Sequence, residues 1–162
     1  MKKMNIALVA HDGRKRELVE WVKYNLDVLV NHNLYATGTT GKKIMEIDGK
    51  ARYDEIYGKY CEHPLAKKVT CLKSGPLGGD QQIGAMIAEG KIDVLIFFCD
   101  NLIVQGHQND VSALTRLASL YNIAFATNRT TADMILTSPL FANETYVKTV
   151  PNCIWEYENR TV

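Results

Sequence analysis

The sequence predicts an α/β protein built as a single-domain, doubly wound, mostly parallel sheet with helices on both faces. Short apolar runs alternate with longer amphipathic segments along the chain, which indicates strands alternating with helices. The most hydrophobic run lacks polar alternation, as expected of a strand covered on both faces. The 162 residues are enough for one core, and they contain no repeat, low-complexity segment or linker. Regular strand–helix alternation favours a parallel sheet.

The expected elements follow one another in a regular order. Residues 5–10 form an apolar run that predicts a buried strand, and residues 14–30 then carry apolar side chains at helical spacing. Residues 92–98 are the most hydrophobic run, so we expect that strand to be central. The other expected strands are 33–36, 69–72, 123–126 and an edge strand at 146–150, and the other helices are 40–47, 79–89, 110–120, 130–136 and 155–160.

One segment, at about 48–68, interrupts this order. It is polar, charged and rich in tyrosine, and its pattern predicts a short helix at 53–60 that ends before His63-Pro64. We expect one domain over 1–162, with 48–68 as an insertion in it.

Composition excludes several classes of partner. The formal net charge is +1, which gives no electrostatic basis for binding nucleic acid or an anionic membrane. The longest apolar run, Val94 to Cys99, is too short to span a bilayer. The N-terminus leads directly into a strand pattern without a signal-peptide h-region. We therefore expect a cytoplasmic location.

The four cysteines have no CxxC spacing, and a chain of this size needs no disulfide, so a reduced environment is the simpler interpretation. Cys61 and His63 could ligate a metal together, but no second pair stands at ligand spacing. We therefore predict no metal site.

Polar residues and glycines gather after each of the first four expected strands. In open parallel sheets the carboxyl ends of the strands meet at one edge, where ligands bind, so these clusters predict one site. They are His11-Asp12, then Thr37-Gly38-Thr39-Thr40-Gly41, then the loop 74–82, and finally Asp100, His107 and Asp110.

Two of these clusters have the composition of anion-binding loops. The stretch 37–41 combines three threonine hydroxyls with two glycines at the start of a helix. Glycine lets backbone N–H groups approach an anion, and the helix N-terminus adds a favourable dipole. A simple turn with a threonine cap is the alternative. The loop 74–79 has the same design and also precedes a helix, so the two together predict a phosphate site. No GxxxxGK[ST] motif is present, which argues against a nucleotide P-loop.

Charged residues near these loops allow a functional and a structural interpretation. Lys15 lies one turn into the first helix and could reach a phosphate, or it could be a solvated surface lysine. Asp80 could act as a base, or it could stabilise a helix N-terminus. His107 could donate to a carbonyl and move protons, or it could be an exposed loop histidine. Asp12 and Asp100 could orient a base or a substrate hydroxyl, or they could cap loops.

Taken together, four motifs strongly resemble the methylglyoxal synthase family. They are Ala10-His11-Asp12, Thr37-Gly38-Thr39-Thr40-Gly41, Ser74-Gly75-Pro76-Leu77-Gly78-Gly79-Asp80-Gln81-Gln82 and Lys91-Ile92-Asp93-Val94-Leu95-Ile96-Phe97-Phe98. The match continues through Ala126-Thr127-Asn128 and Thr131-Ala132-Asp133 to the C-terminus. It departs from the family pattern in the long connection between the second and third motifs, and in Asn101, where the family has a proline.

The resemblance implies a lyase that converts dihydroxyacetone phosphate to methylglyoxal and inorganic phosphate. It also implies a Rossmann-like fold, a homohexamer, inhibition by phosphate under allosteric control, and no metal or organic cofactor. Asp80 would be the general base and His107 would polarise the carbonyl, with Asp12 and Asp100 nearby as catalytic residues and Asp110 supporting the loop. The residues that would bind substrate or its phosphate are His11, Lys15, Thr37, Gly38, Thr39, Thr40, Ser74, Gly75 and the C-terminal Arg160.

Two other functions remain open at the level of sequence. A non-catalytic regulatory domain of the same fold could keep the phosphate loops, but it would not need Asp80, His107 and Asp100 together. A triose phosphate isomerase activity would share the first proton transfer and retain the phosphate.

Overall fold

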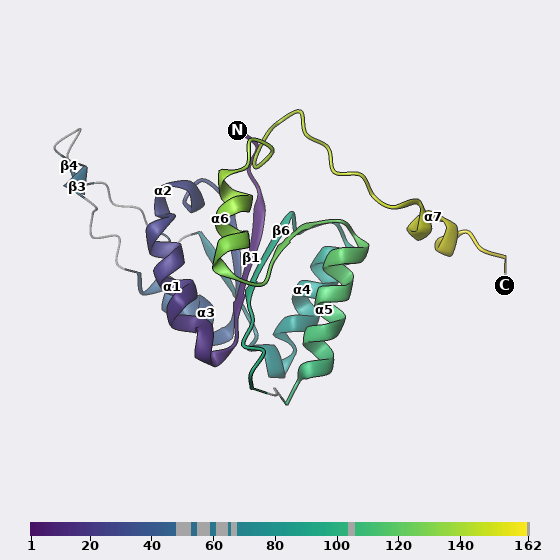
Figure 1. Ribbon diagram of the computed structural model, residues 1–162, viewed down its shortest axis with the longest axis horizontal. Coiled ribbons are helices and arrows are strands. Elements are labelled where there is room, and N and C mark those ends of the chain that lie inside the picture. Colours follow the sequence, from purple (N-terminus) through teal and green to yellow (C-terminus); the bar gives the residue numbers. More distant parts are fainter. Residues whose placement is uncertain (48–52, 55–58, 61–64, 66–67, 104–105, 162) are drawn as a thin grey trace.

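The computed structural model describes residues 1–47, 53–54, 59–60, 65, 68–103 and 106–161. Its centre is a five-stranded parallel sheet with strand order β5-β2-β1-β6-β7 (Figure 1). The strand order reverses direction between β1 and β6, which makes the fold doubly wound, as predicted. The strands are β1 (Asn5–Ala10), β2 (Asn33–Thr37), β5 (Val69–Leu72), β6 (Val94–Phe98) and β7 (Ala124–Ala126).

Helices cover both faces of this sheet (Figure 1). On one face α1, α3 and α6 pack against β-strand residues such as Ile6 and Leu8, and on the other α4 and α5 pack against Ala7 and Val9. Successive residues of a strand point to opposite faces, so each strand feeds both cores. The helices are α1 (Lys15–Tyr24), α2 (Leu26–Leu29), α3 (Gly38–Met45), α4 (Gly79–Ala88), α5 (Gln108–Leu120), α6 (Arg129–Thr137) and α7 (Asn152–Glu158), with short 3₁₀ turns η1 (Asp12–Arg14) and η3 (Gly75–Leu77).

Strand β6, which the sequence predicted at the centre of the sheet, lies next to the central strand. All five residues of β6 are buried, so the absence of alternation correctly predicted a strand covered on both faces. The geometric centre is β1, which pairs with β2 through Ala7 and Tyr35 and with β6 through Ala7 and Leu95.

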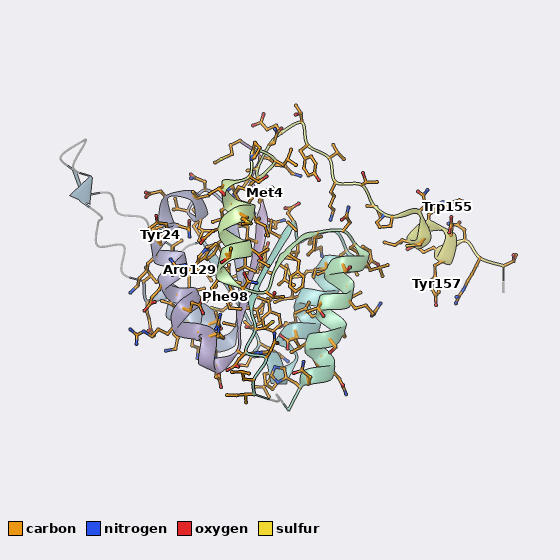
Figure 2. All side chains as sticks on the ribbon, in the orientation of Figure 1. Met4, Tyr24, Phe98, Arg129, Trp155 and Tyr157 are labelled. Carbon is orange, nitrogen blue, oxygen red and sulfur yellow. The ribbon has the colours of Figure 1, made fainter. Side chains whose placement is uncertain are left out.

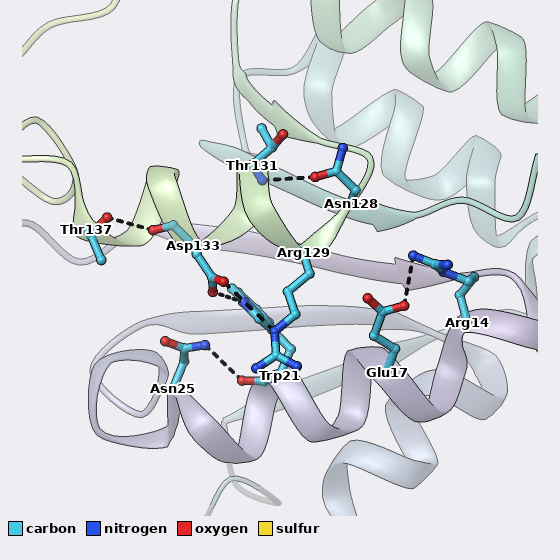
Figure 3. A network of polar contacts seen from close by, with 9 residues as sticks. All are labelled: Arg14, Glu17, Trp21, Asn25, Asn128, Arg129, Thr131, Asp133 and Thr137. Atoms are coloured by element: carbon cyan, nitrogen blue, oxygen red, sulfur yellow. Dashed lines mark hydrogen bonds and ion pairs between the residues drawn. The ribbon is translucent and has the colours of Figure 1, made fainter.

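A polar network fastens α6 to α1 (Figure 3). The buried indole of Trp21 donates a hydrogen bond to Asp133 Oδ1 at 2.7 Å, and Arg129 Nε lies 3.9 Å from the other oxygen of that carboxylate. Asn128 caps α6 by accepting a hydrogen bond from the backbone N–H of Thr131. The network fixes the end of the helix layer on this face of the sheet.

The helix predicted over 14–30 is divided at Asn25. The side-chain amide of Asn25 donates to the carbonyl of Trp21 at 2.9 Å, and the residue leaves helical geometry with φ −101° and ψ 22°. Asparagine competes in this way for backbone groups and favours breaks over helix interiors. The chain therefore forms α1 and the single turn α2 in place of one long helix.

Two further predictions are wrong within the described residues. Tyr53–Asp54 and Lys59–Tyr60 form the antiparallel strands β3 and β4, where a helix over 53–60 was expected; tyrosine favours strands. Residues 146–150 form no strand. The carbonyl of Thr149 accepts a hydrogen bond from the side chain of Asn122 instead of entering a ladder.

The chain ends in an arm that leaves the body of the fold. After α6, the chain runs over the amino edge of the sheet and carries α7 away from the other helices (Figure 1). Helix α7 begins at Asn152, three residues before the expected 155–160, and none of its residues is buried. Figure 2 shows Phe98 inside the body of the fold and Trp155 and Tyr157 on this outlying helix. No helix among the described residues is long and apolar enough to cross a membrane.

Candidate active site

A cavity of about 700 Å³ lies at the carboxyl ends of the central strands. It takes side chains from the ends of β1, β2 and β6, from the turn after β5 and from the loop before α5, so the expected strand-end clusters do meet. The lining residues are Val9, Ala10, His11, Asp12, Lys15, Thr37, Thr39, Ser74, Gly75, Pro76, Asp80, Phe97, Gly106, His107 and Asp110.

Lys15 is held in the cavity wall by two partners. Its ammonium group donates to Asp12 Oδ1 and to the hydroxyl of Thr39. The Lys15 side chain is only 18% exposed, whereas that of Asp12 is 92% exposed, so Lys15 is not a solvated surface lysine. The hydrogen bond and charge of Lys15 hold the pKa of Asp12 below its usual value. An anion entering the cavity would meet a cation that is already oriented.

The two predicted anion-binding loops touch each other. A β-carbon on Gly38, which has φ +24°, would lie 2.7 Å from the Cα of Ser74, so only glycine allows this approach. Thr37 precedes α3 without a side-chain cap, and Ser74 precedes η3 in the same way. The simple threonine-cap alternative is therefore not realised, and the backbone amides at both termini are not occupied by these hydroxyls.

Asp80 is a buried carboxylate in the first turn of α4. It is 2% exposed, and neither of its oxygens has a hydrogen-bond partner among the described residues. Burial, the largest influence, raises its pKa; the nearby His107 opposes that rise and Asp110 adds to it. Such a group has a higher proton affinity than an exposed aspartate, which suits it to accept a proton from carbon.

Two histidines stand beside Asp80 in the cavity. His107 Nε2 lies 3.5 Å from Asp80 Oδ2, with the His107 side chain 17% exposed, so His107 is not an exposed loop histidine. The ring of His11 lies 6.2 Å from that of His107 and 5.0 Å from that of Phe97, measured between centroids. The cavity thus combines a base, two imidazoles and an oriented cation. Together these groups can transfer protons on an anionic substrate.

Four of the predicted site residues do not line the cavity. Gly38 contributes by letting the two loops meet, and the side chain of Thr40 is fully buried in the fold with its hydroxyl unpartnered among the described residues. Asp100 contacts the lining residue His11: its backbone N–H donates to His11 Nδ1, and its carboxylate accepts from the N–H of Leu102. Arg160 lies on the outlying arm, 3.7 Å above the ring of Tyr157.

Other lining residues were not anticipated as site residues. Pro76 and Phe97 also line the cavity. Phe97 could have been recognised, because it precedes the polar cluster after β6 and points to the same face as Leu95. The pair Cys61 and His63, considered above as metal ligands, lies outside the described residues.

Comparison with known proteins agrees with this geometry. A family model described as MGS-like domain matches residues 17–127. Methylglyoxal synthase of Maridesulfovibrio salexigens is 55% identical over 148 residues, covering 88% of each chain. That of Proteus mirabilis is 51% identical over 144 residues, covering 89% of this chain and 84% of the relative.

A solved structure gives the same result in three dimensions. The crystal structure of methylglyoxal synthase from Elizabethkingia anophelis superposes with a TM-score of 0.77 at 41% sequence identity, covering 99% of this chain and 93% of that one. Sequence and fold agree over nearly the whole length. The chain belongs to the methylglyoxal synthase family.

Proposed function

We propose that this protein is a methylglyoxal synthase, a carbon–oxygen lyase that converts dihydroxyacetone phosphate to methylglyoxal and inorganic phosphate. The observation that carries the proposal is the position of Asp80. This buried carboxylate faces the same cavity as Thr39 and Ser74. A carboxylate beside a phosphate site would repel its ligand, so its presence there is explained best by chemistry.

The phosphate would be held by the two loops and Lys15. Lys15 supplies the positive charge, and the hydroxyls of Thr37, Thr39 and Ser74 supply donors from two strand ends. The uncapped backbone amides at the starts of α3 and η3 add further donors, including that of Gly75. Asp12, which pairs with Lys15, would keep the ammonium group in place before the substrate arrives.

Asp80 and His107 would carry out the proton transfers. Asp80 removes a proton from the hydroxymethyl carbon, the neighbour of the ketone that does not carry the phosphate, and His107 donates to the carbonyl oxygen where negative charge develops. The resulting enediolate expels phosphate as the C–O bond breaks with its electron pair going to phosphate, and the enol product becomes methylglyoxal. Elimination is fast when that bond stands perpendicular to the enediolate plane, and a grip from two strand ends would fix this angle. Asp110, at the start of α5, would support the loop carrying His107.

Further properties follow the family resemblance and are proposed with it. We expect a homohexamer in the cytoplasm that is inhibited by inorganic phosphate, with 1–162 folding as one domain and 48–68 as its insertion. Arg160 lies on an arm whose terminal helix buries none of its own residues. We propose that the arm packs on a neighbouring copy and places Arg160 beside that copy's phosphate site.

The decisive assay is incubation with dihydroxyacetone phosphate while methylglyoxal and phosphate are both measured. The two products should appear in equal amounts. Formation of glyceraldehyde phosphate without free phosphate would indicate an isomerase, and no turnover would indicate a binding domain.

Replacing Asp80 tests the proposed base directly. We expect Asp80→Asn to lower kcat by at least about 100-fold, the scale of losing an acid–base group. Asp27→Asn, the same change at an exposed residue of α2, is the matched control and should keep full activity. An Asp80→Asn enzyme with normal kcat would remove Asp80 from this role.

A further inference from the structure

His11 is held in one orientation at the end of β1. Its side chain is 5% exposed, and its ring packs edge-on against Phe97. Its own backbone N–H donates to the carbonyl of Phe98 at 3.2 Å. The ring therefore has little freedom, and His11 lines the cavity.

One ring nitrogen of His11 has a partner that settles its protonation. The backbone N–H of Asp100 donates to His11 Nδ1 at 2.8 Å. A backbone amide can only donate, so Nδ1 must carry a lone pair, and in a neutral imidazole the proton must then be on Nε2. The Asp100 peptide is itself fixed, because the Asp100 carboxylate accepts from the N–H of Leu102 at 3.2 Å.

The same contact resists protonation of the ring. An imidazolium would point an N–H from Nδ1 at the N–H of Asp100, and one hydrogen bond would be lost. Burial, the largest influence, also keeps the pKa of His11 below its usual value. The hydrogen bond with the Asp100 backbone and the charges of Asp100 and Asp80 act in the opposite direction and raise the pKa of His11, whereas His107 lowers it further. Asp12 stands next to His11 on η1.

The other nitrogen, Nε2, is buried and has no hydrogen-bond partner among the described residues. A buried N–H without a partner is costly unless a ligand supplies one. We infer that His11 is a neutral imidazole, held by the Asp100 amide with its proton on Nε2, and that this N–H donates to a phosphate oxygen of the bound substrate.

This inference rests on the proposed function and gives the two histidines different roles. His107 stands next to Asp80 and moves protons, whereas His11 is a fixed donor that does not titrate during turnover. Asp100 is then a positioning residue, because it acts on the ligand through His11 and does not itself line the cavity.

Two substitutions test the roles of the two ring nitrogens of His11 separately. Gln can place an N–H near the position of Nε2, and Asn can place an oxygen near the position of Nδ1. If the Nε2 donor matters, His11→Asn should lower kcat/KM and weaken binding of inorganic phosphate by about 10- to 100-fold, the range for a hydrogen bond to a charged group. His11→Gln should retain more of both. The reverse order, or equal losses, would show that His11 only supports the Asp100 loop, and would overturn the inference.

A spectroscopic measurement tests the tautomer without any variant or activity. Two-bond ¹H–¹⁵N NMR spectra of the wild-type protein should show an unprotonated Nδ1 and a protonated Nε2 for His11, unchanged between pH 8 and about 6. An imidazolium at pH 6, or a proton on Nδ1, would overturn the inference. If the tautomer and the phosphate results hold but dihydroxyacetone phosphate is not turned over, the lyase proposal alone has failed.

Discussion

The side chain of Asp80 is buried at a cost that the fold does not offset. Its carboxylate is 2% exposed and accepts no hydrogen bond from the described residues, while the nearest cationic candidate, His107, is 3.5 Å away. Burying an ionised group without donors is unfavourable, and the N-terminus of α4 compensates only in part. Residues that keep a protein active at the expense of its stability have this character.

Removing this charge should therefore stabilise the protein. The pKa of Asp80 in the folded protein lies above the ordinary value of 3.8. At a pH between the unfolded-state pKa and the folded-state pKa, the folded chain therefore binds more protons than the unfolded chain. The free energy of unfolding then falls as pH rises through that window, and the deficit persists at neutral pH. We expect Asp80→Asn to gain about 1 kcal/mol at pH 7, which raises the midpoint of thermal unfolding by about 2–4 °C in a chain of this size.

The pH dependence identifies the cause of that gain. The advantage of Asp80→Asn should disappear in denaturant titrations below about pH 4, where both chains are neutral at this position. Asp110→Asn, on a partly exposed residue, should change stability less. A gain that is the same at pH 4 and pH 7 would show that the charge of Asp80 is not its source.

Individual residues were predictable where strand position decides their location. His11 follows β1 directly, Thr37 ends β2, and Ser74 lies two residues after β5. Because parallel strands end at one edge of the sheet, their meeting was foreseeable. The bond from the Asp100 amide to His11 joins positions 89 residues apart in sequence, and no local pattern encodes it. Thr40 illustrates the opposite limit. Thr40 belongs to the same threonine-rich loop as Thr39, but it is the next residue along α3 and points in another direction. Its side chain is therefore buried in the fold.

At the scale of elements, hydrophobic periodicity predicted the five sheet strands and their alternation with helices, because each of them buries apolar residues. Hydrophobic periodicity failed where a polar contact, or a pairing outside the main sheet, decides the local structure. The helix break depends on one side-chain bond of Asn25, and β3–β4 pair outside the main sheet. The 146–150 segment has strand-like residues, yet it follows α6 along the amino edge without pairing.

The contact between η3 and α4 gives a prediction at this scale. A β-carbon on Gly75 would lie 3.0 and 3.1 Å from the two carboxylate oxygens of Asp80, so Gly75→Ala should displace the base and fill the space above it. A small misplacement of reacting groups is costly, and we expect kcat/KM to fall by about 10- to 100-fold. Stability should be unchanged or higher, since alanine restricts the unfolded chain. Normal kinetics would show that the η3–α4 contact tolerates a methyl group, and a lower thermal midpoint would contradict the stability argument.

At the scale of the whole molecule, the C-terminal arm leaves aromatic side chains uncovered in a single copy. Helix α7 buries none of its residues, and Trp155 and Tyr157 are 67% and 64% exposed. Large exposed aromatic side chains on an outlying element are typical of a surface that a partner covers (Figure 2). The same arm carries Arg160, which stacks on Tyr157 and lies apart from the cavity of its own chain. A neighbouring copy would explain both observations.

Mixing two impaired variants, Arg160→Ala and Asp80→Asn, tests whether Arg160 acts on a neighbouring copy. Arg160→Ala alone should raise KM and lower kcat/KM by about 10-fold or more, because a charged donor to phosphate is lost, and Asp80→Asn alone should be inactive. In oligomers assembled from both chains, a site with Asp80 from one copy and Arg160 from the next is intact. Random 1:1 assembly should then restore about a quarter of wild-type sites. Activity that merely equals the average of the two variants would place Arg160 at its own chain's site or at none.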